Sequence, residues 1–101
     1  MRKTTAILTT ALMTGALAAL PARAAPTPAS ELSTGNAEEL CDLLDHQFQF
    51  VMKFKSDLPY AKEARTLHDS GVEKCTSGKP RDGVADLRDS LEKVYVTPHT
   101  L

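Results

Sequence analysis

Two cysteines constrain this chain more than any other feature, because they stand at matched positions in two helical segments joined by a short turn. Apolar residues recur at spacings of three and four on both sides of that turn, a pattern typical of helices. A short connection makes the two helices antiparallel neighbours. At 1.5 Å per residue, Cys41 and Cys75 lie roughly 21 and 24 Å from the turn. The spacing therefore predicts a Cys41–Cys75 disulfide.

Local signals set the helix ends. We expect the first helix over 37–55, with Asn36 as its N-cap and Glu39 completing a capping box. We expect the second helix over 58–77, since Gly78 suits the left-handed conformation that ends many helices. Ser56 or Asp57 is the candidate N-cap of this second helix.

A third amphipathic helix is expected over 80–96, with Pro80 near its first position and Thr97-Pro98 ending it. The predicted fold class is all-α: a small three-helix domain over 37–97 that contains a disulfide-linked antiparallel helical hairpin. A tail follows at 98–101.

The first 24 residues have the three parts of a secretory signal peptide: a basic start, an apolar run and a cleavage site after Ala24. The apolar run, Ala6 to Leu20, is short for a membrane span. We expect an exported protein, periplasmic if the host has an outer membrane and otherwise secreted, in a compartment that permits disulfides. Residues 25–36, rich in Pro, Ser, Thr and Gly, are expected to form a flexible leader.

Cleavage after Ala24 would leave 77 residues and remove Arg2, Lys3 and Arg23 but no acidic residue, which changes the formal net charge from −1 to −4. This charge argues against nucleic acid and, after signal cleavage, against membrane surfaces as partners.

The spacing of small and large residues over 64–98 resembles one tetratricopeptide-type helical hairpin, with Gly71, Gly83 and Ser90 as the small positions and Leu67 and Leu87 among the large ones. In that family small residues let paired helices approach closely, and stacked repeats bind peptides. The chain lacks the family's turn aromatic near Cys75 and carries a single repeat. The resemblance implies a packing geometry, with Gly71 at a point of close backbone approach, and leaves the function open.

Metal binding has weak candidates. Asp42 and His46 are four residues apart on one helix face, and His68 lies at the edge of the second helix's apolar stripe. Neither HExxH nor CxxC spacing occurs. A solvated Asp42–His46 pair and a packing role for His68 are the alternative interpretations. We expect no metal and no cofactor.

An enzyme is not expected. The cysteines are engaged with each other, and no serine lies in a nucleophile motif.

The first helix has a broad apolar face that one neighbouring helix does not cover. Either the third helix closes the bundle over it, or part of it binds a partner protein or a second copy of the chain. The candidate partner-binding residues are Phe48, Phe50, Met52 and Phe54. The function expected is therefore a small exported, non-enzymatic interaction or accessory protein. The alternatives are a periplasmic carrier of a metal or small ligand, and a stress chaperone.

Overall fold

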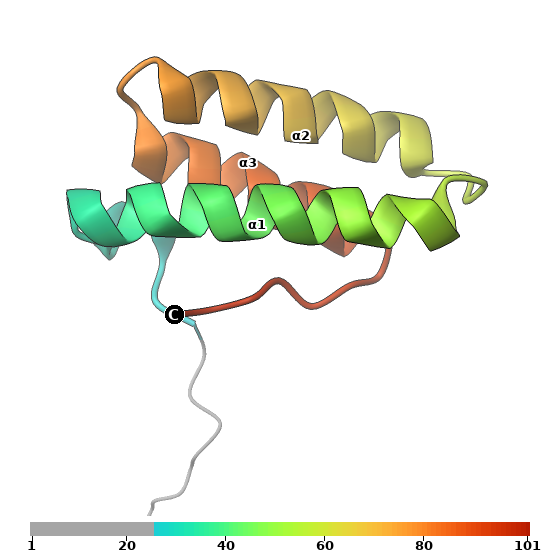
Figure 1. Cartoon of the computed structure of the whole chain (residues 1–101), viewed down its shortest axis with the longest axis horizontal. Coiled ribbons are helices and arrows are strands. Elements are labelled where there is room, and N and C mark those ends of the chain that lie inside the picture. The colour runs from blue at the N-terminus through green and yellow to red at the C-terminus, as the bar shows by residue number, and fades with distance from the viewer. Residues whose placement is uncertain (1–25) are drawn as a thin grey trace, which may run out of the picture.

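The computed structural model describes residues 26–101, so the signal peptide expected at 1–24 lies outside the described residues. A short 3-10 helix comes first and three α-helices follow: η2 (Ala29–Glu31), α1 (Thr34–Lys55), α2 (Ala61–Thr76) and α3 (Pro80–Lys93). Successive α-helices run antiparallel to one another (Figure 1). Residues 26–101 contain no strand, and the all-α three-helix prediction is confirmed. No helix within 26–101 has both the length and the apolar content that a membrane crossing requires.

Helix α1 begins three residues earlier than expected. Ser33 is the N-cap, and its hydroxyl accepts a hydrogen bond from the backbone N–H of Asn36 at 3.1 Å. The capping box predicted from Asn36 and Glu39 is therefore wrong. Ser33 has the advantage because buried Leu32 and Ala37 occupy the two positions of a hydrophobic staple around it.

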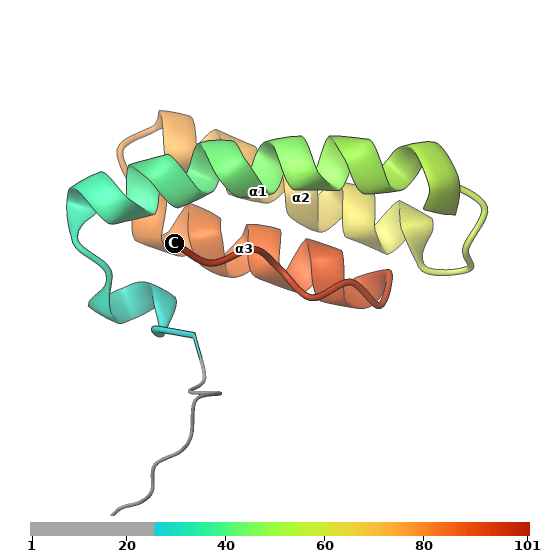
Figure 2. The ribbon, with the colours of Figure 1, turned by 60° about the horizontal axis from the view of Figure 1, so that its bottom comes forward.

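The flexible leader expected over 25–36 overlaps α1, which begins at Thr34. Where the structure describes it, this segment lies against α3 (Figure 2). The side chain of Leu32 is buried in the core. The guanidinium of Arg81 donates to the Leu32 carbonyl at 2.6 Å, and that of Arg88 donates to the Thr27 carbonyl at 2.8 Å. Two arginines of α3 thus hydrogen-bond to the segment before α1, whose composition predicted a flexible leader.

Helix α2 begins at Ala61 rather than 58, and neither Ser56 nor Asp57 caps it. The connection between α1 and α2 forms two successive hydrogen-bonded turns. The Leu58 N–H donates to the Lys55 carbonyl, and the Ala61 N–H donates to the Leu58 carbonyl. These turns use the residues expected to open the helix. At its other end, Gly78 has the predicted left-handed conformation (φ 87°).

Helix α3 begins at Pro80 as expected but ends at Lys93, three residues before the predicted end. Tyr95 takes a left-handed conformation (φ 64°), and Val96 N–H bonds back to the Leu91 carbonyl. This reversal is a Schellman-type end with tyrosine in the place usually held by glycine. It brings half-buried Val96 against the core.

The core lies between the three helices, and α3 contributes most of its fully buried side chains. The largest buried residues are Leu40, Leu44, Leu87, Leu91, Val84, Val94 and Ser90.

Helices α2 and α3 meet at what we call the glycine seam, the contact between Gly71 and Gly83. A Cβ atom at Gly71 would lie 2.8 Å from Cγ of Leu87 and 2.9 Å from the Gly83 carbonyl oxygen. A Cβ at Gly83 would overlap Sγ of Cys75 and lie 2.7 Å from the Gly71 carbonyl oxygen. Both positions therefore need a residue without a side chain.

The predicted disulfide is present. Cys41 of α1 and Cys75 of α2 are bonded, with their Cα atoms 6.2 Å apart. In the chain-entropy model, a cross-link over a loop of this length stabilises a protein by roughly 3–4 kcal/mol. A domain this small gains substantially from such a link.

Candidate functional site

The outer face of α1 carries three large apolar side chains that are exposed to solvent. Leu43, Phe50 and Phe54 are 37%, 60% and 73% exposed. Their spacing of seven and then four residues places them on one side of the helix. The rings of Phe50 and Phe54 meet edge to face with centroids 5.3 Å apart, and Nζ of Lys53 lies 5.9 Å from the Phe50 centroid. We call Leu43, Phe50 and Phe54 the outer stripe.

The structure divides the four candidate partner-binding residues. Phe50 and Phe54 are exposed, whereas Met52 is half-buried against the core. Phe48 as a binding residue is wrong: it is 4% exposed, and its ring stacks on that of His68 with centroids 4.3 Å apart. Phe48 and Phe50 differ by two positions, about 200° around a helix, so one ring faces inward and the other outward.

Leu43 belongs to this surface, although sequence reasoning did not include it among the binding residues. The seven-residue interval from Leu43 to Phe50 was the available signal, because that interval returns a side chain to nearly the same helix face.

Two exposed tyrosines lie at the same end of the bundle as Phe54. There the C-terminal end of α1, the start of α2 and the end of α3 come together (Figure 1). The rings of Tyr60 and Tyr95 meet edge to face at 6.5 Å, and Nζ of Lys93 lies 6.0 Å from the Tyr60 centroid. This tyrosine pair is a second exposed aromatic group, separate from the outer stripe.

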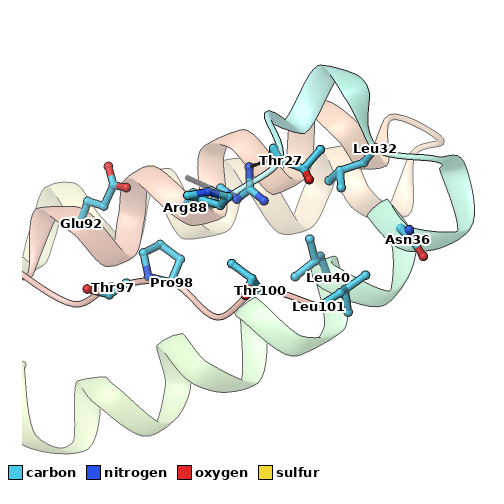
Figure 3. Close-up of a pocket in the computed structure, with 11 residues that line it drawn as sticks. Thr27, Leu32, Asn36, Leu40, Arg88, Glu92, Thr97, Pro98, Thr100 and Leu101 are labelled. Carbon is cyan, nitrogen blue, oxygen red and sulfur yellow. Dashed lines mark hydrogen bonds between the residues drawn. The ribbon is translucent and has the colours of Figure 1, made fainter. Parts of the chain in front are cut away.

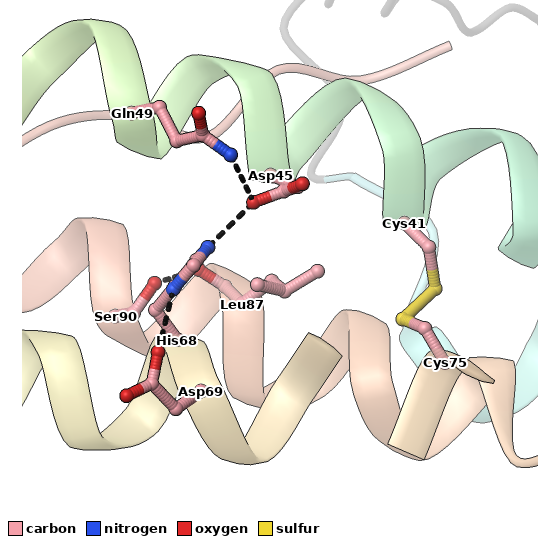
Figure 4. A network of polar contacts seen from close by, with 8 residues as sticks. All are labelled: Cys41, Asp45, Gln49, His68, Asp69, Cys75, Leu87 and Ser90. Atoms are coloured by element: carbon pink, nitrogen blue, oxygen red, sulfur yellow. Dashed lines mark hydrogen bonds and ion pairs between the residues drawn. A yellow bond between two sulfur atoms is a disulfide. The ribbon is translucent and has the colours of Figure 1, made fainter. Parts of the chain in front are cut away.

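The weak metal candidates do not come together. Asp42 and His46 are exposed on α1. His68 instead pairs with Asp45, its Nε2 lying 2.6 Å from a carboxylate oxygen, and its Nδ1 lies 3.2 Å from Asp69 (Figure 4). Within residues 26–101, no group of three or more His, Cys, Asp and Glu side chains is arranged to hold a metal ion.

The Asp45–His68 contact joins α1 to α2. Burial acts to raise the pKa of Asp45, but hydrogen bonds from His68 and Gln49 outweigh it and hold that pKa below its ordinary value. A second polar contact joins α2 to α3, where Asp86 accepts from Ser70 at 2.7 Å and from Lys74 at 2.8 Å. Burial acts to raise the pKa of Asp86, but the hydrogen bonds from Lys74 and Ser70 outweigh it and hold that pKa below its ordinary value. Both contacts connect helices.

A partly open cavity of about 710 Å³ lies between the segment before α1, the start of α1, α3 and the C-terminal tail (Figure 3). Its lining residues are Pro26, Thr27, Leu32, Asn36, Leu40, Arg88, Glu92, Thr97, Pro98, Thr100 and Leu101. Gln47 of α1 holds the tail over it, donating to the Thr97 carbonyl at 3.0 Å and accepting from the His99 N–H at 2.8 Å. The volume suits a small molecule. The lining brings together apolar surface and two opposite charges, Arg88 and Glu92.

Comparisons with known proteins do not identify the chain, because no family model, no curated protein and no solved structure matches it. The resemblance of residues 64–98 to a tetratricopeptide-type hairpin stays a prediction. Functional inference therefore depends on the arrangement of this chain's own residues.

Proposed function

We propose that the chain is a small exported, non-enzymatic interaction protein that binds a protein partner through the outer stripe. The observation that carries this proposal is the exposure of Leu43, Phe50 and Phe54 on one face of α1. Contiguous exposed apolar side chains on a small domain mark an interaction surface more often than a neutral one. Aromatic residues are enriched in the centres of such interfaces.

The remaining polar groups support a non-enzymatic role. Asp45 with His68, and Asp86 with Lys74, bind one another across helix interfaces. Catalytic acids and bases must instead reach a substrate. The net charge of −4 expected after cleavage supports a protein partner over nucleic acid or a membrane surface.

Export is part of the same proposal. The signal-like sequence at 1–24 and the Cys41–Cys75 disulfide both suit an oxidising compartment, the periplasm or the cell exterior. We expect the mature chain to begin at Ala25 and to be two hydrogens lighter than its reduced form. Intact mass of the protein recovered without reductant from each cell fraction checks both. A full-length chain in the cytoplasm would contradict export.

Cross-linking in intact host cells tests the binding surface. The paired variant Phe50→Ser/Phe54→Ser should lose the cross-linked species that the parent chain gives. Tyr95→Asn is the matched control, because it removes an exposed ring outside α1 and asparagine tolerates the left-handed conformation found there. Retention of every cross-linked species by the stripe variant would contradict the proposed binding surface.

A small-ligand carrier is the second candidate, and the cavity favours it. Leu32 and Leu40 line it together with the opposite charges of Arg88 and Glu92, a combination that suits an amphipathic molecule with both an anionic and a cationic group. Native mass spectrometry of the protein purified from its host should then show a retained small molecule. Arg88→Gln should lower the fraction of protein that retains it. Calorimetric titration with zinc, copper, nickel and calcium tests the metal-carrier version, which absence of binding heat would exclude.

A further inference from the structure

We infer that the partner of the outer stripe is a second copy of this chain, docked antiparallel across a two-fold axis that passes beside His46. This inference rests on the proposed function and names its partner. Three properties of α1 carry it: the placement of its exposed apolar residues, the placement of its charges, and the exposure of both sets of side chains in the described structure.

The apolar residues of the stripe are arranged to complement themselves. Leu43 lies three residues before His46, and Phe50 lies four residues after it. An antiparallel partner therefore places its Phe50 opposite Leu43, and the two-fold axis repeats the contact on the other side. The less exposed leucine thus faces the more exposed phenylalanine. A surface that pairs with itself in this way is what an isologous dimer requires.

The charges on the same face select the antiparallel orientation. Glu39 lies seven residues before His46 and Lys53 lies seven residues after it, so each Glu39 faces the partner's Lys53. Parallel pairing would place Glu39 beside Glu39 and Lys53 beside Lys53, which is unfavourable. The helix macrodipoles also favour antiparallel neighbours.

The distribution of charge along α1 strengthens this orientation. Its N-terminal half carries the exposed acidic side chains Glu38, Glu39 and Asp42, and its last turn carries the exposed basic side chain of Lys53. Two antiparallel copies set the acidic half of each helix against the basic end of the other.

The outer face is accessible for such docking. Glu39, His46 and Lys53 are exposed together with the stripe, and the C-terminal tail approaches the stripe at Gln47, between Leu43 and Phe50, which stay exposed beside it. A single helix of 22 residues is about 33 Å long. One helix pair buries less than the roughly 800 Å² per partner of a standard interface. We therefore expect a dimer that dissociates in the micromolar range.

The test is a charge exchange across the two-fold axis. The mature, oxidised chain is studied by sedimentation equilibrium from low micromolar to high micromolar concentration, as the parent, Glu39→Lys, Lys53→Glu and the double exchange. Each single change sets like charges opposite each other twice and should weaken dimerisation about tenfold. The double exchange restores opposite charges and should recover most of the parent affinity.

Control variants separate this contact from a general effect of charge. Glu73→Lys and Lys62→Glu alter exposed residues of α2, and each should leave dimerisation unchanged. Circular dichroism checks that every variant keeps the parent's helical content. Equal weakening by the controls, or a double exchange no better than the single changes, would overturn the inference.

The fate of the proposed function is measured separately. A chain that stays monomeric throughout, yet cross-links in cells to another protein through Phe50 and Phe54, overturns self-association and keeps the outer stripe as a binding surface. A dimer that survives Phe50→Ser/Phe54→Ser overturns the inferred interface. Loss of the dimer in that variant, together with rescue by the charge exchange, supports both.

Discussion

The outer stripe of α1 and the glycine seam between α2 and α3 are opposite extremes of packing within one small domain. At the seam, backbone and side-chain atoms of one helix occupy the space where the other would carry a Cβ atom. On the outer stripe, two phenylalanine rings are more than half exposed. The seam therefore excludes added atoms, whereas the stripe has apolar surface that residues 26–101 leave uncovered. The difference separates the part of the sequence that serves folding from the part available for binding.

Removing the disulfide tests how α1, which carries the stripe, is attached to the pair formed by α2 and α3. Replacing Cys41 and Cys75 with serine should lower the free energy of unfolding by about 3 to 4 kcal/mol. Urea titration measures this loss, and reductant added to the parent chain should reproduce it. An unchanged midpoint would mean that packing alone holds α1 in place.

A side chain added at the seam should be the next most damaging change. Gly71→Leu forces α2 and α3 apart and should cost about 2 to 3 kcal/mol. Gly35→Ala is the matched control in α1, where nothing lies within 4 Å of the added atom, and it should stabilise by up to about 1 kcal/mol. Thermal melts that match the parent's for Gly71→Leu would contradict the close approach.

Much of this packing could be predicted from the sequence, because it depends on spacing along single helices. The disulfide followed from the equal heights of Cys41 and Cys75, and the end of α2 from Gly78. The early start of α1 could not be predicted as readily, since the advantage of Ser33 depends on where Leu32 is buried. The left-handed conformation of Tyr95 likewise could not be predicted, because the usual sequence signal for it is a glycine and this position holds a tyrosine.

The candidate site was predicted only in part, for a related reason. The apolar face of α1 is broader than one neighbouring helix covers, so periodicity alone cannot say which margin faces the core. The position of α2 decides it by bringing His68 onto the ring of Phe48. Phe50 is left outside. The pairing of His68 with Asp45 rather than with Asp42 also depends on how the helices align.

The contact between Asp45 and His68 should make the attachment of α1 sensitive to acid. The pKa of Asp45 is lowered in the folded state, so its contribution is present above the unfolded value near pH 4 and is lost as pH falls through the folded value. Asp45→Asn should cost about 1 kcal/mol near neutral pH. It should also flatten the fall of stability in acid, measured by urea titration at several pH values.

Asp42→Asn is the control for this effect, because Asp42 is an exposed neighbour on the same helix. Its acid dependence should follow the parent's. An Asp45→Asn curve parallel to the parent's between neutral pH and pH 3 would show that the hydrogen bond to His68 contributes nothing to folding.

The smallest effect on stability is expected at the outer stripe. Phe50→Ser with Phe54→Ser should change the free energy of unfolding by less than about 1 kcal/mol, mostly through helix propensity. Phe48→Ser makes the same chemical change in the core and should cost about 3 kcal/mol. Similar losses in the two urea titrations would show that the stripe is packed in solution.

The closeness of Gly71 and Gly83 has a consequence for the kind of force that acts between α2 and α3. Where an alanine would hold its methyl group, each glycine has only a hydrogen on Cα, and a methyl carbon there would lie within 3 Å of the carbonyl oxygen of the other glycine. Carbon donors of this kind can form weak hydrogen bonds to carbonyl oxygens, worth about 0.5 to 1 kcal/mol each. The glycine seam therefore brings two backbones close enough for polar backbone groups, and not only apolar side chains, to act between α2 and α3, in a place that the sequence marks only by the absence of side chains.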